Sequence, residues 1–163
     1  MGLGCHSLAP SPQALSELAR PRIAAHLLAL DADDRHGRFS AVLSDAGIGH
    51  YVERIDFQRD RCLGLFAADG RLIAFIHLAL HGHVAELAAS VLAPQRRRGL
   101  ARALFANALR VAEAEGIREV HLATGHPAAR RICLELGYPV EGSHGYPRAR
   151  ILLGHRLAER AAA

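Results

Sequence analysis

The stretch ASVLAPQRRRGLARALF, residues 89–105, passes from an apolar segment through three arginines and one glycine into a second apolar segment. The residues before it form short apolar runs typical of strands, whereas Leu100, Leu104 and Ala108 recur at helical spacing. The arginines and Gly99 therefore occupy a turn from a strand into a helix. The first N–H groups of a helix have no partner within it and its N-terminus carries about half a positive charge, so such a turn suits an anion.

The residues alone leave two interpretations of this turn open. Gly99 and the small Ala101 give a ligand access to the backbone, and arginines offer paired donors to phosphate, which together indicate a diphosphate site. All twenty basic residues of the chain are arginine, so a solvated arginine cluster is the alternative. No Lys-Ser or Lys-Thr pair follows the glycine and G-x-G-x-x-G is absent, which excludes the usual nucleotide motifs.

The surrounding sequence predicts an α+β domain with a mixed, mainly antiparallel central sheet flanked by helices. Three antiparallel strands are expected at 61–67, 71–80 and 83–92, because Asp69-Gly70 and Gly82 separate three apolar runs. A helix from Gly99 to Gly116 leads to a further strand, and a helical crossover makes these two strands parallel. The remaining expected elements are a strand at 118–124, a helix at 126–137 and strands within 138–142 and 148–157.

The N-terminal part is predicted to be helical after a flexible tail at 1–12. Residues 12–30 predict two short helical pieces interrupted by Pro21, 31–40 a loop or short helix start, and 44–56 a helix. No internal repeat or linker divides residues 13–163, which we therefore expect to form one domain.

Composition excludes several classes of protein. The chain has 163 residues, of which half are apolar, and a net charge of +4, as in a globular protein rather than a disordered one. Acidic residues are interspersed with the arginines and aromatics are few, which disfavours nucleic-acid binding. No apolar run approaches the roughly 20 residues that span a bilayer, so no membrane association is expected. Three cysteines at unrelated spacings predict a reducing, cytoplasmic location and no metal site.

Two segments resemble motifs of the GCN5-related N-acetyltransferase (GNAT) superfamily. Residues 90–105 are similar to motif A, a strand, an Arg/Gln-x-x-Gly-x-Gly/Ala loop and a helix, with Arg96, Gly99 and Ala101 in the signature places. HPAARRICLELGY, residues 126–138, resembles motif B through Ala129 and its Leu-Gly-Tyr ending. The segments 27–40, 51–57 and 85–91 are similar to the branch that contains bacterial protein lysine acetyltransferases.

The resemblance implies the acyl-CoA N-acyltransferase fold, acetyl-CoA as co-substrate and transfer of its acetyl group to a primary amine. Motif A implies that the turn holds the diphosphate and that backbone groups near Val91 bind the pantetheine arm and the oxyanion. The candidate acetyl-CoA-binding residues are Val91, Leu92, Arg96, Arg97, Arg98, Gly99, Leu100, Ala101 and His126.

Glu86 and Cys133 are the candidate catalytic residues. An attacking amine must be neutral, although a lysine-like amine has a pKa near 10.4, so a base is needed. Glu86 is the acidic residue of the strand 83–92, five places before Val91, as the resemblance to the lysine acetyltransferase branch implies. Cys133 stands where many relatives carry an aromatic general acid; water, Tyr51 or Tyr146 could replace that acid.

Several questions stay open at this level. His77, His81 and His83 lie close together in sequence, where we expect a hairpin with exposed imidazoles rather than a metal site. The acceptor could be a protein lysine, a polyamine, an aminoglycoside or an amino acid, and a homodimer is compatible with the sequence. A non-catalytic module that binds acetyl-CoA as a sensor is the alternative function.

Overall fold

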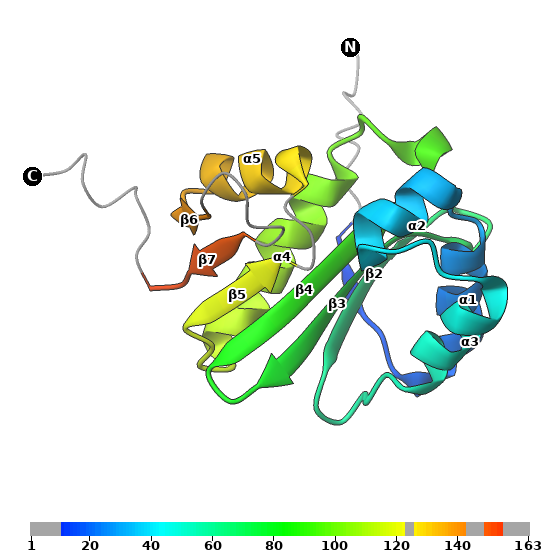
Figure 1. Ribbon diagram of the computed structural model, residues 1–163, viewed down its shortest axis with the longest axis horizontal. Helices are drawn as coiled ribbons and strands as arrows, with labels where there is room; N and C mark the ends of the chain where they lie inside the picture. The colour runs from blue at the N-terminus through cyan, green and yellow to red at the C-terminus, as the bar shows by residue number, and fades with distance from the viewer. Residues whose placement is uncertain (1–10, 123–125, 143–148, 155–163) are drawn as a thin grey trace, which may run out of the picture.

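A seven-stranded sheet, in the order β1-β2-β3-β4-β5-β7-β6, organises the molecule (Figure 1). The computed structural model describes residues 11–122, 126–142 and 149–154. The strands are Gln13–Ala14 (β1), Arg61–Phe66 (β2), Leu72–His81 (β3), Val84–Val91 (β4), Glu119–Leu122 (β5), Val140–Glu141 (β6) and Arg150–Leu152 (β7). The helices are Arg20–Leu28 (α1), Ala32–Phe39 (α2), Asp45–Glu53 (α3), Leu100–Ala114 (α4) and Pro127–Glu135 (α5), with short 3₁₀ turns at Glu17–Ala19 (η1) and Ala93–Gln95 (η2).

The expected antiparallel meander is confirmed in β2, β3 and β4. Arg61 pairs with Leu78 and Phe66 with Leu72 across the first hairpin, and β3 then pairs with β4 from Ala74↔Val91 to His81↔Val84. Gly70 adopts a φ of +82° in the first turn, where a side chain would be strained. The mixed, mainly antiparallel sheet with flanking helices is thus the predicted fold class.

The predicted crossover through α4 makes β5 parallel to β4. Their described ladder runs from Val84↔Glu119 to Leu87↔Leu122, so the last four residues of β4, 88–91, extend beyond it. The C-terminal part of β4 therefore stands at one end of the sheet, next to the turn that starts α4.

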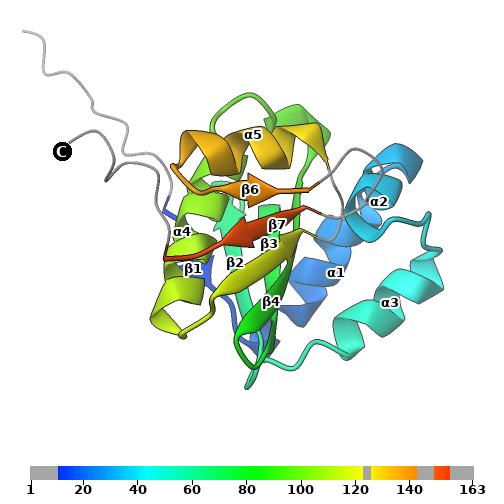
Figure 2. The ribbon, with the colours of Figure 1, turned by 60° about the vertical axis from the view of Figure 1, so that its left-hand side comes forward.

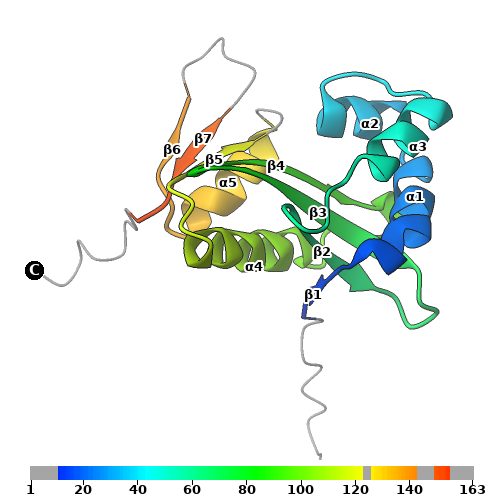
Figure 3. The same cartoon turned by 90° about the horizontal axis from the view of Figure 1, so that it is seen from below.

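The two faces of the sheet are covered by different helices. Helix α4 lies on one face, α1, α2 and α3 lie on the other, and α5 packs beside α4 and β6 (Figures 2 and 3). Strand β3 is buried on both faces: Ile76 and Leu78 join the core under α4, whereas Phe75 joins the core under α1 and α3. The sequence of such a strand is a nearly continuous apolar run, because both of its faces pack against helices.

Three local details differ from the sequence-based expectations. Pro21 lies in the first turn of α1, where its missing N–H costs nothing, and does not interrupt a helix. Residues 32–39 form a complete helix, capped by the Asp31 side chain, which accepts a hydrogen bond from the Asp34 N–H (2.8 Å). Strand β1, only two residues long, was not expected from the sequence because it has no periodicity to detect.

Within residues 11–122, 126–142 and 149–154, no helix has both the length and the apolarity to span a bilayer. Most of the predicted tail 1–12 and the end of the last predicted strand lie outside these residues.

Candidate active site

The turn between β4 and α4 has the backbone conformation of an anion site. Gly99 precedes α4 with a φ of +75°, and Arg97 also adopts a left-handed conformation, with a φ of +63°. Since α4 has 15 residues and no side-chain cap at Gly99, its first N–H groups remain available at this end.

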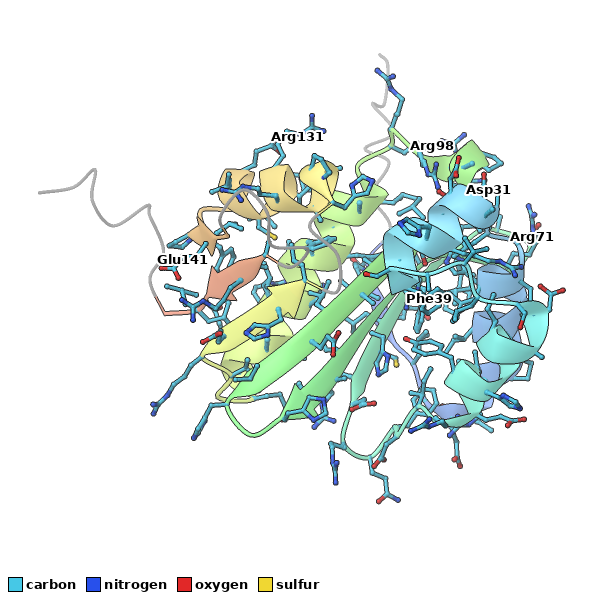
Figure 4. All side chains as sticks on the ribbon, in the orientation of Figure 1. Asp31, Phe39, Arg71, Arg98, Arg131 and Glu141 are labelled. Atoms are coloured by element: carbon cyan, nitrogen blue, oxygen red, sulfur yellow. The ribbon has the colours of Figure 1, made fainter. Side chains whose placement is uncertain are left out.

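The three arginine side chains of the turn differ in their contacts. Arg96 crosses to α2: its Nε donates to the Val91 carbonyl (3.1 Å) and its guanidinium pairs with Asp34 (2.5 Å). Arg98 donates to Gln95 Oε1 (3.0 Å), and both Arg98 and Asp31, at the start of α2, are labelled in Figure 4. Arg96 thus joins the turn to α2, which forms one wall of the site.

A cleft of about 510 Å³ opens at this end of the sheet between α2, β4, the start of α4 and α5. Of the predicted acetyl-CoA-binding residues, its lining includes Val91, Arg96, Arg97, Gly99, Leu100, Ala101 and His126. Leu92 and Arg98 belong to the same turn but are not among the described residues that line the cleft. The predicted set is therefore brought together around one cavity, of the size that binds small ligands.

Helix α5 forms the far wall of the cleft. His126 precedes its first residue, Pro127, and its Nδ1 accepts a hydrogen bond from the Ala128 N–H (3.2 Å), as a capping side chain does. Ala129 and Arg131 of α5 also line the cleft. The segment that resembles motif B thus faces the segment that resembles motif A.

Glu86 lies half-buried in the middle of β4, on the face covered by α1–α3. It is in register with Ala79 of β3 and His121 of β5. Alternate residues of a strand share a face, so Glu86 and Ser90 project to the same side of β4. Leu87 to Val91 line the cleft, whereas Glu86, one residue before them on the same strand, is not among the described lining residues.

Cys133 is fully buried in the core between α5 and the sheet, and the described lining of the cleft does not include it. Burial raises the pKa of its thiol to about 12. Tyr146, another candidate acid, lies outside the described residues, and the Tyr51 hydroxyl is bonded within the core of the opposite face.

That face contains a buried polar network centred on Arg38 of α2. Its two terminal nitrogens donate to the Ser90 Oγ and to the Tyr51 hydroxyl, both at 3.3 Å. Arg38 is only 3% exposed, yet it lines the cleft together with Ser90. The network therefore connects the cleft with the interior of the α1–α3 layer.

Two histidines complete the network, and the expectation that His77 is exposed was wrong. His77 is buried because β3 is covered on both faces; it bonds Asp60 Oδ2 through Nε2 (2.8 Å) and the Tyr51 hydroxyl through Nδ1 (2.6 Å). On the other side of Arg38, His26 donates from Nδ1 to the Leu72 carbonyl (2.9 Å) and accepts at Nε2 from Ser90 Oγ (2.8 Å).

The pKa shifts of the buried groups define the charge of the network. Burial lowers the pKa of His26 to about 4, and burial likewise lowers the pKa of His77 despite its bond to Asp60. Burial also raises the pKa of the Tyr51 hydroxyl. Near neutral pH both imidazoles are therefore neutral. His26 accepts a hydrogen bond from the Ser90 hydroxyl and His77 accepts one from the Tyr51 hydroxyl, and both hydroxyl oxygens accept from Arg38.

Sequence analysis missed this network because its members come from six separate elements or loops and share no motif. Arg38 is one of twenty arginines, and only packing separates it from the solvated ones. The one sequence signal for its burial lay in the polar run 31–40. Arg38 is followed there by the aromatic Phe39, and a side chain of a short amphipathic helix can point toward the core.

The family of this chain follows from the match of its sequence to a family model. Residues 25–138 match the model of the acetyltransferase (GNAT) family, which covers more than half of the chain, and the chain belongs to that family. A search of curated proteins found no match.

Several solved structures share the fold. The GNAT domain of S. lividans PAT is 21% identical, with a TM-score of 0.68, covering 86% of this chain and 87% of that one. Spermidine N-acetyltransferase from Vibrio cholerae, in complex with CoA and spermine, is 20% identical with a TM-score of 0.65, covering 89% and 96%. A phosphinothricin acetyltransferase from Sinorhizobium meliloti, in complex with AcCoA, is 14% identical with a TM-score of 0.65, covering 88% and 87%.

Proposed function

We propose that this protein transfers the acetyl group of acetyl-CoA to a primary amine by direct attack within a ternary complex. The observation that carries the proposal is the turn at 96–101, whose backbone donors open into the cleft between β4, α2 and α5 in a chain of an acetyltransferase family. Structural neighbours crystallised with CoA or AcCoA support the same co-substrate.

The turn is proposed to hold the diphosphate. The backbone N–H groups from Gly99 to Ala101 supply donors at the positive end of α4, and Arg97, which is exposed, adds a charge at the rim. Val91 lines the cleft at the C-terminal end of β4, which is where a pantetheine arm would meet the strand. The Val91 N–H is the proposed oxyanion donor.

Glu86 is proposed to serve as the base through a water. The amine nitrogen attacks the thioester carbonyl carbon, the new C–N bond forms and the C–S bond breaks, while one amine proton passes through water to the Glu86 carboxylate. A water relay is proposed because Glu86 itself is not among the described lining residues, although the next residue, Leu87, is.

Water is also the proposed proton donor to the leaving thiolate. The Cys133 thiol is buried outside the cleft lining, so a role for it as general acid finds no support in its position. Coenzyme A is a fairly good leaving group, and its thiolate can be protonated by solvent.

A thiol-release assay with acetyl-CoA and a panel of amines tests the proposal, with Glu86→Gln as the key variant. We expect Glu86→Gln to lower kcat at neutral pH by about 100-fold, as loss of a general base does, and to leave acetyl-CoA affinity unchanged. Glu53→Gln, on the exposed end of α3, is the matched control and should retain full turnover. Unchanged turnover in Glu86→Gln would contradict the role of Glu86.

The position of Cys133 favours one second candidate, a non-catalytic acetyl-CoA sensor, because the family's aromatic acid is replaced by a buried thiol. Calorimetric titration with acetyl-CoA distinguishes the two: binding without thiol release from any amine would support the sensor.

A further inference from the structure

The guanidinium of Arg38 is buried at the wall of the cleft without a carboxylate partner. Among the described residues, no Asp or Glu oxygen lies within ion-pair distance of it, and its buried Nε has no hydrogen-bond partner. By contrast Arg35, one turn earlier in α2, pairs with Asp45 at 2.8 Å and donates to three backbone carbonyls. Within the described residues Arg38 therefore has no carboxylate in direct contact, and the nearest one in its hydrogen-bonded network, Asp60, is reached only through His77 and Tyr51.

Neutral groups hold this charge in place. The guanidinium carbon stands 4.9 Å from the centre of the Phe75 ring, and the rings of Phe39 and Tyr51 lie at 5.4 and 5.9 Å. The Ser90 and Tyr51 oxygens accept its two hydrogen bonds, and each hydroxyl is in turn fixed by a histidine. A buried charge is costly unless it is paired, so a site built this way favours an anion that arrives from the cleft.

The cleft as a whole also favours an anion. Its described lining holds five arginines and three acidic residues, and Asp34 is already paired with Arg96. The diphosphate has its own donors at the turn, on α4. Arg38 instead contacts Ser90, on the side of β4 that Glu86 shares, which is the side from which the proposed base meets the amine.

We propose that Arg38 binds a carboxylate of the acceptor, so that the acceptor is an amine that also carries a carboxylate, such as an amino acid. This inference rests on the proposed function and names its substrate class. A guanidinium has five N–H groups in a planar fork, and the two bonds to Ser90 and Tyr51 leave others that can pair with the oxygens of a carboxylate. A polyamine would bring further positive charge to a guanidinium that contacts no carboxylate among the described residues, and would be disfavoured.

Matched acceptor pairs that differ only in the carboxylate test the inference: lysine with cadaverine, and phenylalanine with phenethylamine, with spermidine as a polycation. We expect kcat/KM to be higher for the carboxylate member of at least one pair. Arg38→Met should lower kcat/KM for that member by about 10- to 100-fold, the usual effect of losing a hydrogen-bonded charge, and leave its partner within about threefold. Arg71→Met removes the same charge from an exposed hairpin and should change neither.

Two further measurements keep the outcome interpretable. Thermal unfolding should show Arg38→Met folded and no less stable than the wild type, because a buried charge is removed. If that variant does not fold, Arg38→Lys retains the charge without the planar fork and should show an intermediate loss for the carboxylate member. Equal losses for both members of a pair, or a preference of the wild type for spermidine, would overturn the inference.

Binding without turnover separates this inference from the proposed function. Calorimetric titration of lysine and of phenylalanine into the protein saturated with CoA should show binding that Arg38→Met weakens at least tenfold. If no amine releases thiol but this Arg38-dependent binding is seen, the transferase function fails and the carboxylate site stands. If neither amino acid binds in an Arg38-dependent way, the carboxylate site is wrong, whatever the turnover.

Discussion

The two faces of the sheet are built from different chemistry. Under α4 the described buried side chains are apolar, as with Leu104, Leu109 and Ile76, and Cys133 lies among them. Under α1–α3 the apolar cluster around Ile23 and Phe75 also encloses the three described buried polar or charged residues, His26, Arg38 and His77.

This difference separates stability from recognition. An apolar core contributes free energy in proportion to the area it buries, whereas a buried polar network roughly offsets its own desolvation and is retained for another purpose. In this protein the polar face is also the one that carries Glu86 and reaches the cleft at Ser90. Each prediction below tests one side of this division.

The largest expected effect is on the apolar face. Leu109→Ala removes a fully buried side chain from α4 and should lower the free energy of unfolding by about 3 kcal/mol, measured by urea denaturation. Because Leu109 does not line the cleft, acetyl-CoA affinity of the folded variant should be unchanged. A loss of affinity without a loss of stability would show that the two faces are not separable in this way.

The next effect is a pH dependence that belongs to the polar face. The pKa of His26 is lowered to about 4 by burial, against 6.5 in the unfolded chain, so the unfolded state binds the extra proton first as the pH falls. Stability is therefore full above pH 6.5 and should fall by on the order of 3 kcal/mol by pH 4. His77, whose pKa is also lowered by burial, adds a loss of the same sign.

Urea denaturation at pH 7, 5.5 and 4.5 measures this slope. His26→Gln should have a smaller slope than the wild type, whereas the exposed His50→Gln should keep it. If His26→Gln retains the full slope, the acid sensitivity comes from elsewhere in the chain.

The smallest effect is expected at the turn where the faces meet. Gly99→Ala places a side chain at a φ of +75° and should cost about 1 kcal/mol, which corresponds to roughly fivefold weaker acetyl-CoA binding if the loop shifts to relieve the strain. Gly70→Ala has a similar φ, +82°, in the β2–β3 hairpin, and is the matched control. Both variants should lose similar stability, and calorimetry should show weaker acetyl-CoA binding for Gly99→Ala alone.

Much of the fold could be predicted because its signals are local. Apolar runs separated by Asp69-Gly70 and Gly82 define the meander, and helical spacing between Gly99 and Gly116 defines α4. The turn at 96–99 could be located for the same reason. A turn that needs a positive φ usually contains glycine, and the helical spacing begins directly after it, so both signals lie within a few consecutive residues. Short elements such as β1, and the full extent of α2, have too few residues for a periodic pattern.

The catalytic candidates were only partly predictable. The position of Glu86 in a strand followed from its apolar neighbours, but its position relative to the cleft depends on how α2, α4 and α5 are arranged around the end of β4. The burial of Cys133 outside the cleft depends on how α5 rotates against the sheet, which the sequence of one helix does not specify.

By itself the sequence determined the meander, the crossover and the strand-to-helix turn that we propose binds the diphosphate, because each rests on residues adjacent in the chain. Only the tertiary structure decided which of twenty arginines is buried at the cleft. Arg38 becomes distinct because Ser90, Tyr51 and Phe75, from separate elements, surround it. The burial of Arg38 and the lack of a carboxylate among its described contacts are properties of that arrangement in space, and no local pattern of residues encodes them.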